Sequence, residues 1–440
     1  MTIKRADLRS IFQLKTALGL IFAQRIWQGG AGIVTILILT HMLSLEAQGR
    51  YYSFLSFAAL YTLFDLGLSL VLVQAAAHSS ASLRWTADGH NEVASRLSAL
   101  IAFGTRYYAL LALAFLLLVL PAGWLFFTEF SPQFPDWQPA WVALAVAVAL
   151  SLLVIPILAV FEGSGEVAAV AGVRLTQSVI GSLATWAVLL AGGELWATVM
   201  TPLGTLACGA VWIVSRHPSV FSSLRANSQP IDWKTELLPL QWRIGLSWFS
   251  GYLLTQMHTL VLFSTQGAAA AGQIGLSMTI GNMIGLFAQS FIARHVPAMA
   301  KAVALRDWSE FDSLFRRDFA LSCALFIASA IATIGLAAIL SYTAYGTRVL
   351  PVVPFSGLLL ALFLGHVHGA LATQLRSYRQ EPLIWVAAAG ALTTLLLVLP
   401  AARAAGAEGI VAVMLVVQVI IVLPLSLLLF RRRNRAWRAT

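Results

Sequence analysis

The chain has 440 residues, of which 59% are apolar and only 10% are charged, and its mean hydropathy is +0.83. A soluble domain carries roughly 25% charged residues, so this composition excludes a soluble globular protein. The net charge of +10 would suggest a nucleic-acid partner for a soluble chain, but here the basic residues lie between apolar segments and no nucleic-acid partner is expected.

Long apolar segments follow one another along the whole chain. A spanning helix needs about 20 apolar residues, because the hydrocarbon layer of a bilayer is ~30 Å thick. The sequence therefore predicts an all-α, polytopic membrane protein of about twelve transmembrane helices, at 18–43, 51–77, 101–127, 139–161, 167–191, 195–215, 241–264, 272–296, 318–340, 353–375, 383–402 and 408–430. The first segment is too long for a signal-peptide core, so we expect it to be a spanning helix.

Lys and Arg residues gather in alternate connections between these segments. They are frequent at both ends of the chain and after the second, fourth, sixth, eighth and tenth segments, whereas the opposite connections hold only Arg50, Arg348 and Arg403. Cytoplasmic loops retain positive charge, so both termini are predicted to be cytoplasmic, in a bacterial inner membrane. The basic tail is expected to contact anionic membrane lipids.

The longest cytoplasmic connection inside the chain divides the predicted helices into six and six. It contains Pro218 and Pro230, which favour turns and loops. We therefore expect an N-terminal six-helix lobe at 1–216, a cytoplasmic linker at 217–240, and a C-terminal six-helix lobe with a basic tail at 241–440. Internal repeats of this kind are common in transporters.

Two ionisable residues lie deep in the first two predicted helices. Asp65 is ~18 Å and Arg25 ~12 Å from the cytoplasmic end of its segment at 1.5 Å per residue. Arg25 is flanked by Gln24 and Gln28. An ion at this depth is costly and normally faces a cavity or a partner. Two interpretations stay open: a buried Arg25–Asp65 ion pair that fixes packing, or an anion-binding Arg25 with Asp65 as a proton or cation coupling site.

The second half offers weaker candidates. His258, Gln256 and His366 are predicted to line a cavity, while a hydrogen-bonded packing role is the alternative for each histidine. Arg243 and Arg294 lie near the cytoplasmic ends of predicted helices. There they favour headgroup anchoring, and a cation at the rim could also bind phosphate.

The sequence contains no arrangement typical of an enzyme. No carboxylate pair, nucleophile–base set or metal-ligand spacing appears in the predicted cytoplasmic loops, and the predicted outer loops are all short. The two cysteines, Cys208 and Cys323, fall inside apolar segments, which favours buried thiols. We predict no catalytic residue, no metal site and no cofactor.

Several short motifs occur in the order and spacing of a known family. They lie at 45–52 (Leu-Glu-Ala-Gln-Gly-Arg-Tyr-Tyr), 63–69 (Leu-Phe-Asp-Leu-Gly-Leu-Ser), 73–78 (Val-Gln-Ala-Ala-Ala-His), 161–166, 271–276 and 291–297. The series resembles the polysaccharide-export branch of the MOP (multidrug/oligosaccharidyl-lipid/polysaccharide) exporters over most of the chain. Two positions depart from that pattern: His258 lies near a position where members often carry an acid, and His78 stands where they often have Arg.

The resemblance implies a flippase for lipid-linked oligosaccharides. Two six-helix lobes would form a V around a central cavity, and cations such as Arg25 would hold the phosphates of a polyprenyl-linked oligosaccharide while the lobes rock. Polysaccharide-assembly proteins are the further partners that this function implies.

Other functions remain open at this point. A cation-coupled multidrug antiporter of the same superfamily is the main alternative, and its cavity should be acidic. A membrane glycosyltransferase or polymerase is disfavoured because a large outer loop is missing. The segment 78–100 lacks the Gly-x-x-x-Asp-Arg-x-Gly-Arg pattern that major-facilitator transporters place after their second helix.

Overall fold

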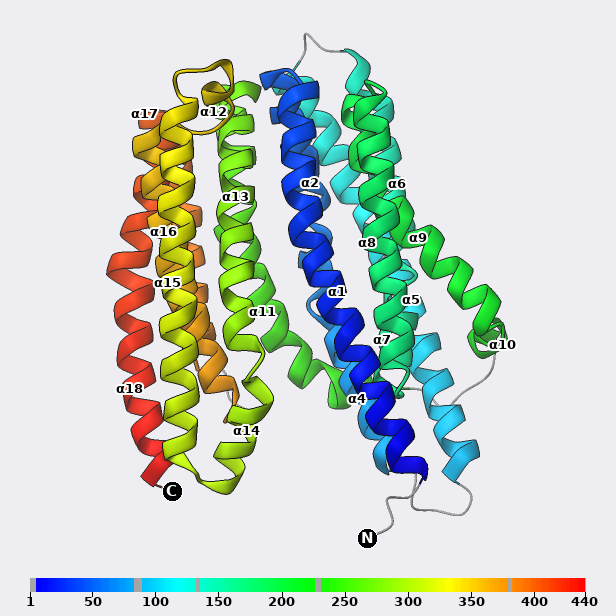
Figure 1. The fold of residues 1–440 in the computed structure, drawn as a ribbon. Helices are drawn as coiled ribbons and strands as arrows, with labels where there is room; N and C mark the ends of the chain where they lie inside the picture. The colour runs from blue at the N-terminus through cyan, green and yellow to red at the C-terminus, as the bar shows by residue number, and fades with distance from the viewer. Residues whose placement is uncertain (1–4, 83–88, 132–134, 226–230, 379–381, 440) are drawn as a thin grey trace. The chain divides into compact units, whose positions relative to one another are not determined.

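The computed structural model describes residues 5–82, 89–131, 135–225, 231–378 and 382–439, and within these ranges it contains helices and no strand (Figure 1). Contacts divide the chain into two units. Unit 1 comprises Met1–Met42 and Phe57–Trp248, and unit 2 comprises Leu43–Ser56 and Phe249–Thr440. The predicted all-α, polytopic class is confirmed. The predicted lobe boundaries at 216 and 241 stay a prediction.

Unit 1 contains most of the helices in the first half of the chain. They are α1 (Arg5–Met42), α3 (Tyr61–Asp65), α4 (Leu68–Ser82), α5 (Gly89–Phe130), α6 (Gln138–Leu152), α7 (Ile155–Gly163), α8 (Val167–Leu190), α9 (Ala197–Arg216) and α10 (Val220–Arg225), with the short 3-10 helices η2 (Pro135–Trp137) and η3 (Glu194–Trp196) and the π-helix η4 (Trp233–Leu237). The helix α11 (Leu238–Thr255) begins in unit 1 and ends in unit 2.

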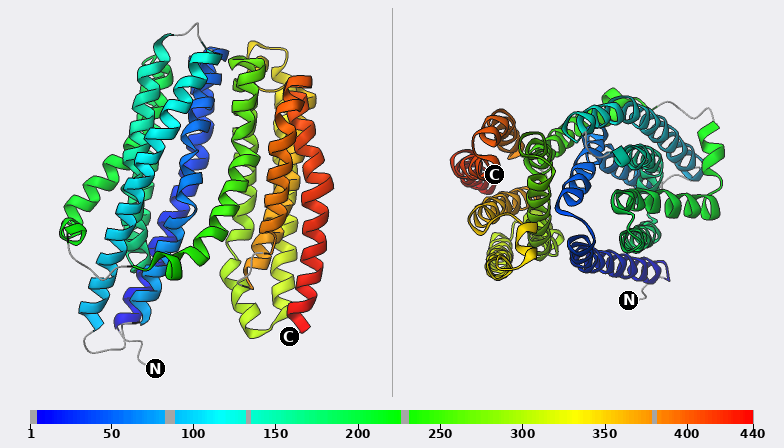
Figure 2. Two further views of the ribbon diagram at one scale, coloured as in Figure 1. Left: turned by 180° about the vertical axis from the view of Figure 1, so that it is seen from behind. Right: turned by 90° about the horizontal axis from the view of Figure 1, so that it is seen from above.

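Unit 2 begins with most of α2 (Leu45–Ala58) and resumes at Phe249, inside α11. Its later elements are α12 (Met257–Gln266), α13 (Ala268–Ala293), α14 (Val296–Leu305), α15 (Trp308–Leu340), η5 (Ala344–Arg348), α16 (Val352–Arg376), α17 (Ile384–Val416), η6 (Val417–Val422) and α18 (Leu423–Ala439). The helices α13, α15 and α16 lie side by side (Figure 2). Their core contains fully buried Phe355, Leu358 and Ile274.

The structure has fewer candidate membrane-spanning helices than the twelve predicted spans, because several helices are broken or joined. By length and hydropathy, nine helices of the described ranges could cross a membrane, or ten if Leu45–Asp65 and Leu68–Ser80, bent by 42°, form one span. The predicted span 241–264 is divided at Gln256, between α11 and α12. The predicted spans 383–402 and 408–430 are joined in one long segment that breaks at Ala405 and Gly406.

That last break reverses the chain. Gly406 has φ +55°, in the left-handed region that glycine adopts readily. Beyond it, a Cβ on Gly409 would lie 2.1 Å from the carbonyl oxygen of Ala401. The two sides of the break therefore pack directly against each other, which is why one long apolar segment contains two predicted spans.

Within unit 1, α1 packs along α8 through two tryptophans. The indole Nε1 of Trp27 donates to the Ser178 carbonyl oxygen at 3.3 Å, and Nε1 of Trp186 donates to Thr35 Oγ1 at 2.8 Å. The two indole rings lie 6.1 Å apart. Polar groups at membrane depth need protein partners because hydrocarbon offers none, so these bonds fix α1 to α8.

Within unit 2, α2 is held by backbone carbonyls of later elements. Gln48 Nε2 donates to the carbonyl oxygens of Gly272 at 2.9 Å and Arg348 at 3.1 Å, and Arg348 Nη1 donates to the Leu43 carbonyl oxygen at 2.5 Å. A Cβ on Gly49 would lie 1.8 Å from the Ala268 carbonyl oxygen. Small residues allow such close helix contacts in membranes, so Gly49 is what brings α2 against α13.

We expect the substitution Gly49→Ala to destabilise unit 2 by about 1–3 kcal/mol, the usual cost of forcing an extra methyl group into a packed contact. Gly251→Ala is the matched control, because a Cβ there has nothing within 4 Å and alanine favours the helix. Thermal unfolding in detergent measures both. Equal unfolding midpoints for the two variants would contradict the close contact.

Candidate functional site

The second predicted span is interrupted next to its deep acid. Asp65 is the last residue of α3, and Leu66 (φ 48°) and Gly67 (φ +71°) then turn the chain into α4. A Cβ on Gly67 would lie 2.0 Å from Ile244 Cγ2, and one on Gly245 would lie 2.9 Å from Leu66 Cβ. The broken helix is therefore seated on the first part of α11.

The side chain of Asp65 is buried at this break, with 3% of its surface exposed. Its carboxylate accepts a hydrogen bond from the hydroxyl of Tyr108 on α5 and another from Ser69 Oγ at 3.3 Å. A buried polar group costs free energy unless it is hydrogen-bonded. These two donors allow an acid to persist at this depth.

A second set of hydrogen bonds joins Tyr107, the chain neighbour of Tyr108, to α11. The ring of Tyr107 lies 6.2 Å from that of Tyr108, and its hydroxyl accepts from Gln241 Nε2 at 3.0 Å. Gln241 is buried, and its Oε1 accepts from Trp233 Nε1 at 2.7 Å. One polar cluster thus joins the α3–α4 break, α5 and α11.

The segment before α11 is itself fixed by a capping acid. Asp232 accepts from the backbone N–H of Lys234 at 3.1 Å and from the hydroxyl of Thr235 at 2.8 Å. The hydrogen bond from Thr235 holds the pKa of the Asp232 carboxyl below its usual value. The turn that places Trp233 against Gln241 therefore begins with an ionised cap.

The Arg25–Asp65 ion pair, one of the two interpretations left open by the sequence, does not form in the described ranges. The partners of Asp65 are Tyr108 and Ser69, whereas Arg25 is exposed on α1. The reason is that α1 packs along α8, so that the polar side chains of α1 around Arg25 face α8. Gln24 and Gln28 each donate from Nε2 to Ser178 Oγ at 3.4 Å. These two glutamines join α1 to α8, and the predicted coupling role of Asp65 stays a prediction.

Two exposed arginines flank the polar cluster, and sequence reasoning missed one of them. Arg106 precedes Tyr107 on α5, and Arg243 follows Gln241 by two residues on α11, with its guanidinium 5.6 Å from the Trp242 ring. Within the described ranges no ion pair involves Arg25, Arg106 or Arg243. Arg106 lies about 8 Å inside the predicted span 101–127 at 1.5 Å per residue, and that depth was the available signal.

The candidates in unit 2 are engaged in packing. His258 is fully buried, and its Nε2 lies 3.1 Å from the Leu254 carbonyl oxygen. Gln256 Oε1 accepts from Ser56 Oγ at 3.4 Å. His366 Nε2 lies 2.8 Å from Ser322 Oγ, whose hydroxyl donates to a backbone carbonyl.

The remaining candidate in unit 2, Arg294, pairs with a buried acid. It donates to Asp318 at 3.1 Å, and His295 Nδ1 lies 2.5 Å from the other oxygen of the same carboxylate. Asp318 is fully buried. Arg294 therefore differs from Arg25, Arg106 and Arg243, because its charge is compensated within the unit.

The chain is similar to known proteins in its fold but not detectably in its sequence family. No family model and no curated protein matches the chain. Among solved structures, the DinF-BH MATE multidrug transporter in complex with rhodamine 6G matches with a TM-score of 0.64 at 14% identity, covering 96% of each chain. An inward-facing MATE transporter of the MOP superfamily has a TM-score of 0.62 at 14% identity, covering 92% of this chain and 99% of that chain.

A third solved structure, the lipid II flippase MurJ in an inward closed conformation, has a TM-score of 0.59 at 14% identity, covering 95% of this chain and 87% of that chain. The chain shares its fold with these three structures. Together with its apolar helices, the fold makes it a multi-pass membrane protein. MOP-fold structures include both drug transporters and a lipid flippase, so the fold by itself does not select the cargo.

We expect the substitution Tyr108→Phe to lower the stability of unit 1 by about 1–3 kcal/mol, because Asp65 would lose its donor from α5 while staying buried. Tyr61→Phe is the control, since within the described ranges no hydrogen bond is formed by the Tyr61 hydroxyl. The measurement is thermal unfolding in a cycle that includes Asp65→Asn. Additive effects of Tyr108→Phe and Asp65→Asn would contradict the contact, because coupled neighbours are non-additive.

Proposed function

We propose that this protein is a membrane transporter that moves a lipid-linked oligosaccharide of the polyprenyl-pyrophosphate type across the inner membrane for polysaccharide biosynthesis. It would act by alternating access, in which binding sites are exposed to one side and then the other. The MOP fold supports transport, and the cargo is argued from charge.

The observation that carries the proposal is an imbalance of free charge in unit 1. Arg25, Arg106 and Arg243 are exposed without an ion-pair partner in the described ranges. The acid deep in the same unit, Asp65, is buried beneath Tyr108 and Ser69. Of the charged residues that lie inside predicted spans of this unit, these arginines are thus the ones offered to a ligand, which suits a pyrophosphate.

The chemistry of the cargo fits these groups. Arginine binds phosphate oxygens through a planar set of donors, and hydrogen bonds between charged groups are about twice as strong as neutral ones. A pyrophosphate cannot cross hydrocarbon unaided, whereas its polyprenyl tail is soluble there. A protein that supplies cations to the headgroup and leaves the tail in lipid would lower the barrier for the polar part alone.

The second candidate is a cation-coupled multidrug antiporter, since one similar structure is a MATE transporter in complex with rhodamine 6G. A cationic cargo would need accessible acids. In the described ranges the acids Asp65, deep in a predicted span, and Asp318, at the end of one, are both buried and hydrogen-bonded or ion-paired. The charge distribution therefore favours the anionic cargo.

We expect Arg25→Ala, Arg106→Ala and Arg243→Ala, singly and combined, to reduce surface polysaccharide in cells that depend on this protein. Loss of one charged hydrogen bond costs about 1.5–3 kcal/mol, which corresponds to about 10- to 100-fold weaker binding. The corresponding lysine variants should retain part of the output. Output is measured by quantifying surface polysaccharide at equal protein levels.

Arg174→Ala provides the matched control, because Arg174 is partly exposed but pairs with Glu162 through two hydrogen bonds of 3.2 and 2.6 Å. Its polysaccharide output should stay near wild type. Wild-type output from the triple alanine variant would overturn the proposal. A selective loss of dye or drug resistance in that variant would support the antiporter.

A further inference from the structure

The outer face of α18 combines an apolar stripe with a row of arginines. The helix lies at the edge of unit 2 (Figure 1, Figure 2), and its residues Leu425 and Leu428 are 41% and 55% exposed. Arg432 and Arg435 follow Leu428 by four and seven residues. Helical spacing places these side chains on one face, so that face changes from hydrocarbon to guanidinium within about two turns.

This change coincides with the end of the last predicted span. The predicted span 408–430 leaves Leu425 and Leu428 inside the hydrocarbon layer. At 1.5 Å per residue, Arg432 lies about 3 Å and Arg435 about 8 Å beyond the end of the span, which is the headgroup level. In the predicted orientation this level belongs to the cytoplasmic leaflet, where anionic lipids give the surface a negative potential.

The charges on this face are not compensated by the protein. Arg431, three residues after Leu428, extends the same face. In the part of the chain that the structure describes, Arg431, Arg432 and Arg435 are exposed and take part in no ion pair. No acid occurs in the sequence from 431 to 439. A phosphate at this level would therefore gain charge-assisted hydrogen bonds, which are the strong ones.

The other face of the same turns is clamped to the rest of unit 2. Arg438 donates from both terminal nitrogens to the Asp312 carboxylate of α15, one bond measuring 2.8 Å, and its guanidinium lies 5.6 Å from the Trp308 ring. Asn434 Oδ1 accepts from Arg438 Nε at 3.1 Å and from the Tyr378 hydroxyl at 2.8 Å. The clamp holds the outer arginines in position before a ligand arrives, which lowers the entropy cost of binding.

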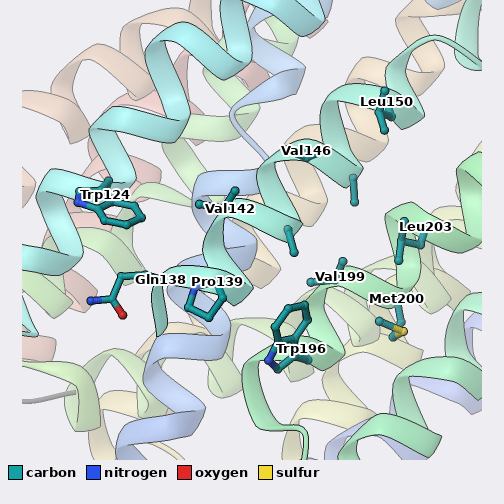
Figure 3. Close-up of a pocket in the computed structure, with 12 residues that line it drawn as sticks. Trp124, Gln138, Pro139, Val142, Val146, Leu150, Trp196, Val199, Met200 and Leu203 are labelled. Carbon is teal, nitrogen blue, oxygen red and sulfur yellow. The ribbon is translucent and has the colours of Figure 1, made fainter. Parts of the chain in front are cut away.

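The apolar groove between α6 and α9 of unit 1 shows the contrast (Figure 3). Its lining includes Trp124, Val146 and Leu203, and none of the residues that line it is charged. Hydrocarbon of any lipid can cover such a surface, and no charged group there selects a headgroup. The α18 face differs because its apolar stripe continues directly into positive charge.

We propose that the outer face of α18 is a binding site for an anionic glycerophospholipid of the cytoplasmic leaflet, with phosphatidylglycerol as the simplest example. One acyl chain lies along Leu425 and Leu428. The phosphate accepts hydrogen bonds from Arg432 and Arg435, and Arg431 adds a third positive charge. A basic tail attracts anionic lipids in general, whereas this geometry selects three of the five tail arginines for one lipid. The site is independent of the transported cargo.

The first test titrates delipidated full-length protein with dioleoyl phosphatidylglycerol or dioleoyl phosphatidylethanolamine and counts bound lipids by native mass spectrometry. The ammonium of phosphatidylethanolamine neutralises its own phosphate. Wild-type protein should therefore bind the first phosphatidylglycerol about tenfold more tightly or better. The double variant Arg432→Gln/Arg435→Gln should lose this preference while keeping its affinity for phosphatidylethanolamine.

The matched control is the double variant Lys301→Gln/Arg433→Gln, which removes the same number of charges from the same end of unit 2 (Figure 1). Arg433 follows Leu429 by four residues, and Leu429 packs against the core of unit 2, so Arg433 lies on the other side of α18. Lys301 is exposed on α14. This control should keep the wild-type affinity for phosphatidylglycerol. An equal loss in the two double variants would overturn the proposal.

The clamp separates a built site from general electrostatic attraction. Asp312→Ala removes a negative charge, so attraction alone would strengthen the binding of phosphatidylglycerol. Because the variant also releases Arg438, the proposed site should bind phosphatidylglycerol severalfold more weakly. Tighter binding in this variant would contradict the proposal.

A competition experiment identifies the source of the phosphate. Glycerophosphoglycerol, the water-soluble headgroup, should not displace dioleoyl phosphatidylglycerol at millimolar concentration, because the buried acyl chain supplies much of the binding free energy. Displacement by the free headgroup, or equal binding of the two lipids by wild-type protein, would overturn the lipid site.

Discussion

The burial of one carboxyl group at membrane depth determines how unit 1 is arranged. Asp65 needs donors because hydrocarbon supplies none, and Tyr108 and Ser69 provide them. The break at Leu66 and Gly67 turns the chain beside this carboxyl group and rests on α11. The Tyr107–Gln241 hydrogen bond then ties α5 to the same part of α11. A substitution at any of these residues is therefore expected to disturb the packing of the α3–α4 break, α5 and α11 together.

The same arrangement decides which charges a ligand can meet. Because Asp65 and Asp318 are each neutralised or hydrogen-bonded inside their own unit, neither is offered at the surface. Arg25, Arg106 and Arg243 are exposed, and no ion pair in the described ranges compensates their charge. The contrast between engaged acids and free cations is the physical basis for an anionic cargo, and the fold alone would permit either cargo.

Hydropathy was sufficient for the helices and the fold class, because a span needs an apolar segment of a set length. It could not show which helices touch. Of the two interpretations left open for Arg25 and Asp65, the ion pair does not occur, because α1 packs along α8 and hydropathy cannot predict that packing. Twelve predicted spans correspond to nine or ten apolar helices in the described ranges for two main reasons: the chain breaks at Gln256 inside one span, and the last two spans are joined in one segment that bends at Ala405. Arg106 was missed because a cation near a helix end resembles a headgroup anchor.

The central claim is that the exposed arginines of unit 1 select an anionic amphiphile. The most direct measurement is binding to purified protein of polyprenyl pyrophosphate and of rhodamine 6G, alone and in competition, at low and high salt. The account predicts that polyprenyl pyrophosphate binds, that rhodamine 6G does not displace it, and that affinity falls with salt as exposed charges are screened. Tight binding of rhodamine 6G, with no binding of polyprenyl pyrophosphate at low salt, would contradict it.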